Sequence, residues 1–206
     1  YAKLRHAETR YRLLFQVSSE AVMIVDAASS MILDANPDVT SKAGLFKKVW
    51  AEQHKGMVEY RPQHKTIAVD AKTNTVKFDV QDDVKAAVLN VIPSMRAGAI
   101  AVKAGLNNQA NSRWCGVNYL TFESTAAKDV HVLGDSIQIA PAMPKSGHMA
   151  NNHGKVAAAA IVAQLSGWDV NPAPMLTNTC YSFVDTKNVI HVASVHEYVA
   201  AEKTYK

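Results

Sequence analysis

The stretch Val130-His131-Val132-Leu133-Gly134-Asp135, together with the loop and helix after it, decides the predicted fold. It is mostly apolar or β-branched up to Gly134, which predicts a short buried strand. Beyond Pro141 and Pro144, residues 154–165 consist mainly of Ala, Ile, Val and Leu, which predicts a helix packed closely on a sheet. Strand, turn and helix in this order form half of a nucleotide-binding unit, whose ligand lies at the carboxyl end of the strand.

The turn residues carry the chemistry that such a unit needs. Gly134 lets the backbone approach a ligand closely, and the Asp135 carboxylate accepts hydrogen bonds from sugar or polyol hydroxyls. The free N–H groups that start the following helix favour a phosphate or an electron-rich ring edge. The alternative interpretation is a plain Gly-Asp turn, which is a common pair between a strand and a helix.

The sequence around this turn is specific well beyond the Gly-Asp pair. Residues 129–158, DVHVLGDSIQIAPAMPKSGHMANNHGKVAA, closely resemble the second flavin-binding motif of the flavoprotein subunit of flavocytochrome c sulfide dehydrogenase. Sulfide:quinone reductases are more distant relatives. The resemblance implies that Gly134 and Asp135 contact the ribityl chain and pyrophosphate of FAD. It also implies that the Pro-Lys-Ser-Gly loop, with Lys145 and Ser146, runs beside the isoalloxazine.

Composition limits the other function classes. The chain has 206 residues, of which 48% are hydrophobic and 19% charged, as in an ordinary globular protein. The net charge is +4, but Lys and Arg are scattered, so nucleic acid is not expected and an acidic protein partner or an anion is favoured. No apolar run is long enough for a membrane span, and the polar opening predicts no secretory signal. No Cys/His spacing typical of zinc occurs, so no metal site is predicted.

The first part of the chain carries a second resemblance. Residues 3–20 have the apolar spacing of an amphipathic helix, and residues 21–25 and 31–33 have the composition of two strands. Residues 10–37, RYRLLFQVSSEAVMIVDAASSMILDANP, resemble the start of a PAS sensor domain, without a matching continuation. The alternative is a helix and hairpin that share common words with that domain.

The next segment of the sequence again resembles the first family. Residues 32–62, ILDANPDVTSKAGLFKKVWAEQHKGMVEYRP, resemble the second nucleotide-binding domain of flavocytochrome c sulfide dehydrogenase. The resemblance implies a parallel strand that ends at residues 32–34 and a helix over residues 45–53. Ser41 or Thr40 could cap that helix.

Further elements follow from local patterns. The alternation predicts a hairpin of residues 66–69 and 75–80, and residues 179–184 and 189–195 predict a second antiparallel pair. The continuous apolar run 87–92 predicts a buried parallel strand. A helix is expected over residues 96–104, stopped by Gly105, and a strand or turn over residues 120–124.

Cys180 is the predicted catalytic residue. In the family that the chain resembles, the cysteine of this segment lies beside the flavin and pairs with another cysteine in sulfide oxidation. The alternative for Cys180 is a buried structural thiol, the role that we expect for Cys115. Whether Cys115 could serve as the partner of Cys180 stays open, because the sequence gives no geometry.

The chain also departs from the family pattern. The family's partner cysteine and the cysteine that attaches its flavin covalently have no counterpart among the residues before Met31. No two glycines are separated by a single residue, so the G-x-G-x-x-G fingerprint that normally holds the FAD pyrophosphate is absent from the sequence. The sequence therefore predicts about half of a flavin site.

The predicted fold class is α/β, an incomplete two-dinucleotide-binding-domain flavoprotein of the disulfide-reductase-like type with a C-terminal antiparallel interface segment. The predicted parts are a PAS-like leader of helix and hairpin (residues 1–30), a partial second nucleotide-binding domain (31–94), the C-terminal half of an FAD-binding domain (95–168) and a flavin-shielding and interface segment (169–206).

The resemblance implies a flavin-dependent oxidoreductase that binds FAD, oxidises sulfide, and passes electrons to a c-type cytochrome subunit in the periplasm, with this chain incomplete or impaired. Two alternatives are a PAS-like sensor or binding module, and a non-catalytic truncated fragment that self-associates through unpaired sheet edges and exposed apolar surface. The role of Cys180 separates catalysis from binding.

Overall fold

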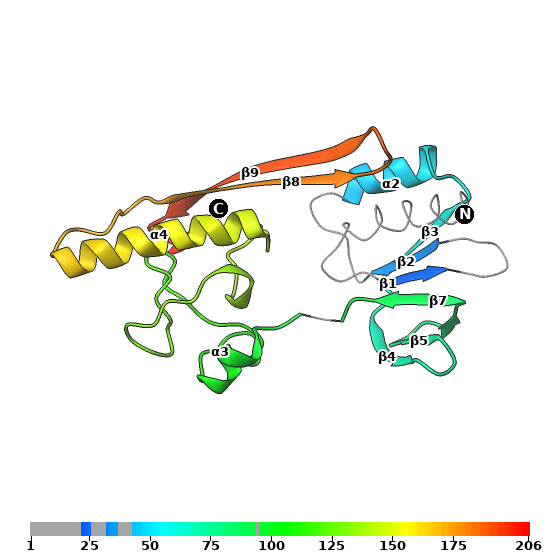
Figure 1. Cartoon of the computed structure of the whole chain (residues 1–206), viewed down its shortest axis with the longest axis horizontal. Helices are drawn as coiled ribbons and strands as arrows, with labels where there is room; N and C mark the ends of the chain where they lie inside the picture. The colour runs from blue at the N-terminus through cyan, green and yellow to red at the C-terminus, as the bar shows by residue number, and fades with distance from the viewer. Residues whose placement is uncertain (1–21, 26–31, 37–42, 94) are drawn as a thin grey trace. The chain divides into compact units, whose positions relative to one another are not determined.

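The computed structural model describes residues 22–25, 32–36, 43–93 and 95–206 of the chain. These residues separate into two units (Figure 1). The first unit contains the described residues up to Met95 together with Tyr181–Ile190, and the second contains Arg96–Cys180 and His191–Lys206. The chain therefore enters the first unit twice, the second time as the tip of a hairpin.

The first unit contains a four-stranded mixed sheet in the order β3-β2-β1-β7. Its strands are β1 (Val22–Val25), β2 (Ile32–Asn36), β3 (Val58–Pro62) and β7 (Val88–Val91). Strand β1 is antiparallel to both β2 and β7, whereas β2 is parallel to β3. The two short strands predicted near residues 21–25 and 31–33 are confirmed, and so is the parallel pairing of the second one.

Helix α2 (Ala43–Glu52) lies between β2 and β3 in the chain, which makes a β-α-β crossover. Its buried side chains are Phe46 and Trp50, four residues apart on one face, and the Trp50 ring lies 5.5 Å from the ring of Tyr60 in β3. The predicted helix over residues 45–53 is thus confirmed.

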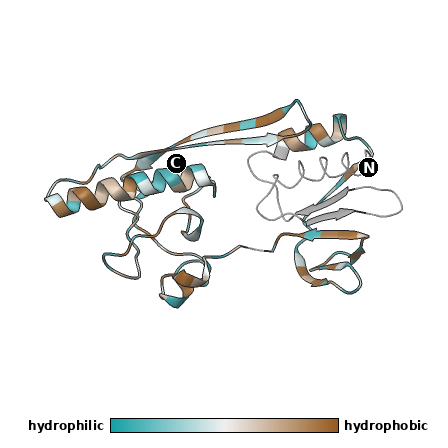
Figure 2. Ribbon diagram, in the orientation of Figure 1, coloured by the Kyte–Doolittle hydropathy of each residue, from teal (hydrophilic) through white to brown (hydrophobic). Residues whose placement is uncertain are grey.

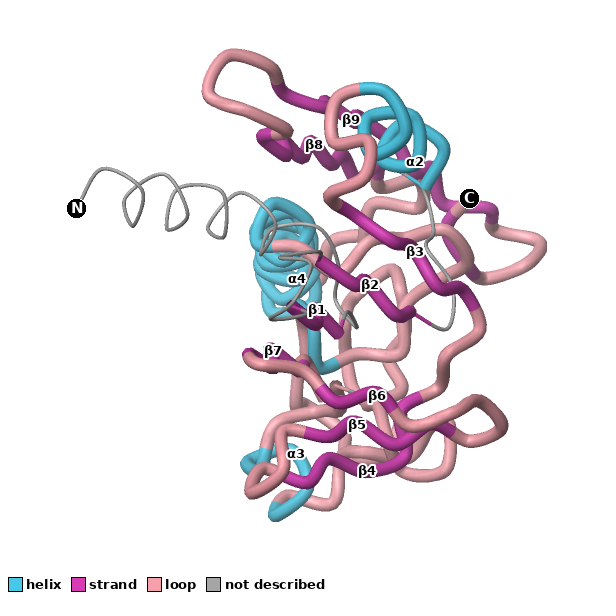
Figure 3. Tube along the Cα trace, turned by 90° about the vertical axis from the view of Figure 1, so that its right-hand side faces the viewer, coloured by secondary structure: helices cyan, strands magenta, loops and turns pink. Residues whose placement is uncertain are grey.

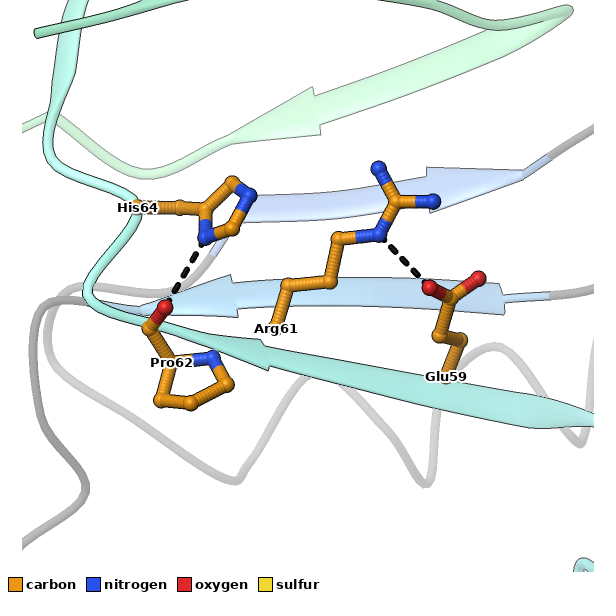
Figure 4. A network of polar contacts seen from close by, with 4 residues as sticks. All are labelled: Glu59, Arg61, Pro62 and His64. Carbon is orange, nitrogen blue, oxygen red and sulfur yellow. Dashed lines mark hydrogen bonds and ion pairs between the residues drawn. The ribbon is translucent and has the colours of Figure 1, made fainter. Parts of the chain in front are cut away.

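Strand β3 ends in a set of local polar contacts. Arg61 Nε donates to Glu59 Oε1 at 2.7 Å (Figure 4). Nδ1 of His64 forms a hydrogen bond with the carbonyl oxygen of Pro62, at 2.9 Å. The same ring meets Phe78 edge to face, with 4.9 Å between the centroids. The contacts of His64 join the end of β3 to the next sheet.

That next sheet is a three-stranded antiparallel meander of β4 (Thr66–Asp70), β5 (Thr75–Phe78) and β6 (Val84–Lys85), shown in Figure 3. Alternation along β5 buries Val76 and Phe78, which form a small core with Ala86. The hairpin predicted from residues 66–69 and 75–80 is confirmed, although β5 ends two residues earlier.

The second unit contains α3 (Ala99–Lys103), the 3-10 turn η1 (Gly134–Ser136), the long helix α4 (Gly147–Ser166) and most of the sheet β10-β9-β8. The strands of this sheet are β8 (Met175–Phe183), β9 (Val189–Val199) and β10 (Thr204–Tyr205). The predicted helix 154–165 and the predicted strand pair 179–184 and 189–195 are confirmed, and each extends further than predicted.

A core lies under α4. Met149 and Ala157 of the helix pack with Phe122, Ile137 and other buried residues, which are Ala140, Met143, Leu176 and Tyr205. Figure 2 shows that hydrophilic residues gather on the N-terminal half of α4 and hydrophobic ones on its C-terminal half. The polar half is the half that begins near the Gly134 turn.

The buried strand predicted at residues 130–133 is wrong. This segment forms one isolated bridge, between His131 and Glu123, and then turns into η1 at Gly134. Val130 and Leu133 are exposed, and among the described residues the one bridge of this segment does not extend into a ladder. An apolar run becomes a buried strand only where it pairs into a sheet whose faces other elements cover.

Two other predictions need correction. The run 87–92 forms β7, but β7 is antiparallel to β1, because apolar composition does not specify strand direction. It also lies at the edge of its sheet, where Val88 is exposed. The helix expected over 96–104 is shorter, since Arg96 to Gly98 are extended, and it ends before Gly105, whose φ is 69°. Residues 120–124 form a turn and two isolated bridges.

The predicted amphipathic helix over residues 3–20 and the caps Thr40 and Ser41 lie outside the described residues. The PAS-like leader is outside them too, except for the strand residues of β1 and β2.

Candidate functional site

Gly134 lies at the start of η1 and directly against α4. Its φ is 69°, and a Cβ on this residue would lie 3.2 Å from the Cβ of Ala150 in the first turn of the helix. The Gly134 N–H donates to His153 Nδ1 at 3.1 Å. Glycine is therefore required here for both the backbone conformation and the close approach to the helix.

Lys145 holds the turn to the loop before α4. Its ammonium donates to the carbonyl oxygens of Asp135, at 2.6 Å, and Ile137, at 3.0 Å, and lies 3.6 Å from the ring centroid of Trp114. Burial lowers the pKa of Lys145, while the Asp135 carboxylate acts in the opposite direction. The carboxylate itself is exposed, so the turn presents it to solvent.

Ser146 is the N-cap of α4. Its hydroxyl oxygen accepts the N–H of Met149 at 3.0 Å, and the Ser146 carbonyl accepts the N–H of Ala150. The same hydroxyl donates to Asn178 Oδ1 of β8 at 2.6 Å. Ser146 thus connects the start of the helix to the strand that carries Cys180.

Cys180 lies on β8, half-buried, two residues after Asn178. Asn178 Nδ2 donates to Cys180 Sγ at 3.4 Å. Two further contacts hold this part of β8 to the first turns of α4: Asn152 Nδ2 donates to the Thr177 carbonyl at 3.2 Å, and the Thr179 N–H donates to His148 Nδ1 at 3.2 Å.

Cys115 is fully buried beside the same turn. Its N–H donates to the Ser136 carbonyl, and its carbonyl accepts the N–H of Gln138. Burial raises the pKa of the Cys115 thiol, an effect that the positive charge of Lys145 opposes. Both cysteines are free thiols, so Cys115 is not bonded to Cys180.

His153 completes the inner side of the site. Its ring stacks on Phe122 with 4.5 Å between the centroids, and among the described residues its Nε2 has no hydrogen-bond partner. Burial, together with the charge of Lys145, lowers the pKa of His153 to about 4. Because Nδ1 accepts the Gly134 N–H, the proton of the neutral ring is on Nε2.

The structure brings the five predicted site residues to the N-terminal end of α4, and they come from three separate stretches: Gly134 and Asp135, Lys145 and Ser146, and Cys180. Sequence reasoning missed Trp114, His153 and Asn178. A signal existed for Asn178, because residues two apart in a strand share a face and Cys180 is its neighbour on that face. The sequence held no signal for Trp114, whose contact with Lys145 spans 31 positions of the chain.

Solved structures with a similar fold define the class first. A chain of the Tetrahymena thermophila mitochondrial ATP synthase is 17% identical, with a TM-score of 0.53 over 77% of this chain and 37% of that one. The sulfide:quinone oxidoreductase of the bacterium Aquifex aeolicus is 15% identical, with a TM-score of 0.50 over 73% of this chain and 40% of that one. The chain thus has a mixed α/β fold found in that oxidoreductase, and it spans about two fifths of either matched chain.

Family comparison then gives the particular assignment. Residues 18–93 match the family model for the central part of the sulfide dehydrogenase (flavocytochrome c) flavoprotein chain, and residues 172–206 match that for the flavin-binding part of flavocytochrome c sulphide dehydrogenase. The two matches together cover more than half of the sequence. This chain belongs to the flavocytochrome c sulfide dehydrogenase flavoprotein family, as its sequence resemblance predicted.

The first match begins at residue 18, ahead of the predicted start of the family segment at Met31. The family match therefore includes much of the stretch that resembles the start of a PAS domain. The PAS resemblance stays a prediction. In the part of the chain that the structure describes, no helix has both the length and the hydropathy that crossing a membrane requires.

Proposed function

We propose that this chain contributes part of an FAD-dependent sulfide oxidoreductase, in which Cys180 carries the sulfur chemistry. One observation carries the proposal: the Gly134–Asp135 turn, the Lys145–Ser146 loop and Cys180 meet at one end of α4 and are joined there by hydrogen bonds. The match of residues 172–206 to a flavin-binding family model supports a flavin as the cofactor.

The residues present suit one part of an FAD site. The exposed Asp135 carboxylate offers acceptors for ribityl hydroxyls. The first turn of α4, below Ser146, has orphan N–H groups that favour a phosphate or an electron-rich ring edge. Lys145 holds the turn through two carbonyls, so we assign it to shaping the turn as well as to the flavin side of the loop.

The reaction is a two-electron oxidation. Hydrosulfide loses two electrons and a proton to give zero-valent sulfur. A bound flavin would supply the chemistry that accepts the two electrons, and a c-type cytochrome partner would receive them. The Cys180 thiolate is the group that bonds to sulfur, because Cys180 is half-buried and Cys115 is fully buried. Family membership supports a periplasmic location for this reaction.

The test begins with the visible absorbance of the purified chain before and after addition of FAD. We expect bound flavin, with Asp135→Ala weakening its binding roughly tenfold, because a hydrogen bond to a charged group is lost. Asp169→Ala changes an exposed aspartate in the loop after α4 and should leave binding as it is. If the wild-type chain gives no bound-flavin spectrum, the proposed cofactor is wrong.

The second measurement follows flavin bleaching by sulfide without oxygen. Cys180→Ser should abolish the bleaching while the flavin stays bound, since the hydroxyl is a poor nucleophile at neutral pH. Cys115→Ala, a change of a residue outside the proposed sulfur chemistry, should retain bleaching provided that the variant folds. Bleaching at the wild-type rate in Cys180→Ser would remove Cys180 from the mechanism.

A further inference from the structure

A chain of hydrogen bonds runs from the first turn of α4 to the sulfur of Cys180. The Met149 N–H donates to Ser146 Oγ at 3.0 Å, the Ser146 hydroxyl donates to Asn178 Oδ1 at 2.6 Å, and Asn178 Nδ2 donates to Cys180 Sγ at 3.4 Å. All of these groups belong to one unit of the chain. The chain of contacts ends on the residue that we assign to sulfur chemistry.

Every donor in this chain points toward the sulfur. Met149 N can only donate, so Ser146 Oγ accepts from it and keeps its own proton for Asn178. The separation of 2.6 Å between Ser146 Oγ and Asn178 Oδ1 is a length typical of O–H···O, shorter than usual for N–H···O, which places the amide oxygen toward Ser146. The amide N–H then faces Cys180.

Asn178 and Cys180 differ in burial, which strengthens the hydrogen bonds of the Asn178 amide and leaves the Cys180 sulfur accessible. Asn178 is only 5% exposed, so its amide has little competition from water, and hydrogen bonds in such surroundings polarise one another. Cys180 is half-buried, which leaves its sulfur within reach of a small molecule.

We propose that Asn178 is a positioning residue, which holds the Cys180 sulfur and stabilises its thiolate through the relay from Ser146. The inference rests on the proposed function, because it deepens the role assigned there to Cys180. A thiolate accepts hydrogen bonds and cannot donate one, so the amide N–H stabilises the reactive form over the thiol. The longer contact from Cys180 Sγ to Asn178 Oδ1, at 3.9 Å, is the geometry that the thiol would use instead.

The test measures alkylation of Cys180 by iodoacetamide in the full chain without added flavin, from pH 6 to pH 9 by quantifying the Cys180 peptide in a mass spectrometer. Asn178→Asp keeps the shape and an acceptor for Ser146 but removes the donor and adds negative charge. We expect alkylation at neutral pH to slow roughly tenfold and its pH profile to move to higher pH.

Three further variants separate the relay from simple anchoring. Ser146→Ala should slow alkylation part of the way, and Ser146→Thr, which keeps a capping hydroxyl, should restore it. Asn152→Ala is the matched control, since Asn152 also ties β8 to α4, through Thr177, but lies outside the relay. Its alkylation profile should equal that of the wild type.

Unchanged profiles in both Asn178→Asp and Ser146→Ala, in variants that circular dichroism shows to be folded, would overturn the inference. Equal slowing in Asn152→Ala would also overturn it, because anchoring alone would then explain the effect. The outcome is distinct from that of the proposed function: a chain that binds no FAD can still show the dependence on Asn178, and an active flavoprotein can lack it.

Discussion

His153 shows at the scale of one residue how the fold sets the charge of a group. It is buried on α4, accepts the Gly134 N–H, and has its pKa lowered from 6.5 to about 4, first by burial and then by Lys145. The folded protein therefore excludes a proton that the unfolded chain accepts. Burial also lowers the pKa of His196, which acts in the same direction.

This excluded proton predicts a pH dependence of stability. Between pH 6.5 and about 4 the unfolded chain binds more protons, so the free energy of unfolding falls as the pH falls, by roughly 3 kcal/mol for His153 over the whole window. Urea unfolding at several pH values measures it. His153→Gln should show a shallower loss than the wild type, and an unchanged slope would contradict the role of His153.

Gly134 and Gly154 allow a matched pair of alanine substitutions. Gly134→Ala should destabilise the chain by about 1–2 kcal/mol, because φ is 69° and the new Cβ would lie 3.2 Å from that of Ala150. Gly154→Ala, inside α4 with open space around the new Cβ, should stabilise it by about 0.5–1 kcal/mol. Thermal unfolding of both variants checks the sign, and equal shifts would contradict the assigned role of Gly134.

At the scale of elements, α4 is the helix that organises the second unit. Its buried positions follow spacings of three and four, and the residues are Met149, His153, Ala157, Ala160 and Ala163. Three of the five are alanine, so the helix backbone lies close to the residues that it covers. Close packing of this kind tolerates little added volume.

That packing predicts a difference between two neighbouring alanines. Ala157→Leu should destabilise the chain by about 1–3 kcal/mol, because Ala157 lies in the core with Phe122 and Ile137. Ala159→Leu, two residues away and exposed, should change the stability by less than about 0.5 kcal/mol. The free energy of unfolding in urea distinguishes the two, and a neutral Ala157→Leu would mean that this face of α4 is loosely packed.

At the scale of the whole molecule, large apolar side chains remain exposed at the C-terminal end of α4. Val162 is 53% exposed, Leu165 85%, and Trp168, just after the helix, 68%. Val162 and Leu165 are three apart on the helix, and Trp168 follows directly after it, so exposed apolar area gathers at this end of α4. The chain also spans only about two fifths of the matched solved chains.

This surface predicts concentration-dependent self-association of the isolated chain. Sedimentation velocity at increasing concentrations should show species larger than a monomer. The double variant Leu165→Lys and Trp168→Lys should reduce them strongly, since both side chains are exposed and the added charges repel. A control pair, Asn151→Lys and Ala159→Lys, changes the charge equally at exposed positions of α4. A wild-type chain that stays monomeric throughout would contradict the prediction.

The sequence by itself determined those elements whose cause is local. Helix α4 follows from the run of Ala, Ile, Val and Leu over residues 154–165, and the hairpins of β4 with β5 and β8 with β9 follow from alternating or β-branched runs and turn residues. The family resemblance implied helix α2. The family assignment came from the sequence resemblance, and the family comparison confirmed it. Local interactions suffice for these, because each depends on residues within a few positions of one another.

Only the tertiary structure decided what depends on distant partners. Residues 130–133 have strand composition but form one isolated bridge among the described residues, and β7 runs antiparallel at a sheet edge. The relay from Ser146 to Cys180 joins positions more than thirty residues apart. Composition states what a segment can do, whereas the hydrogen bonds and the burial that it obtains depend on which distant residues pack against it.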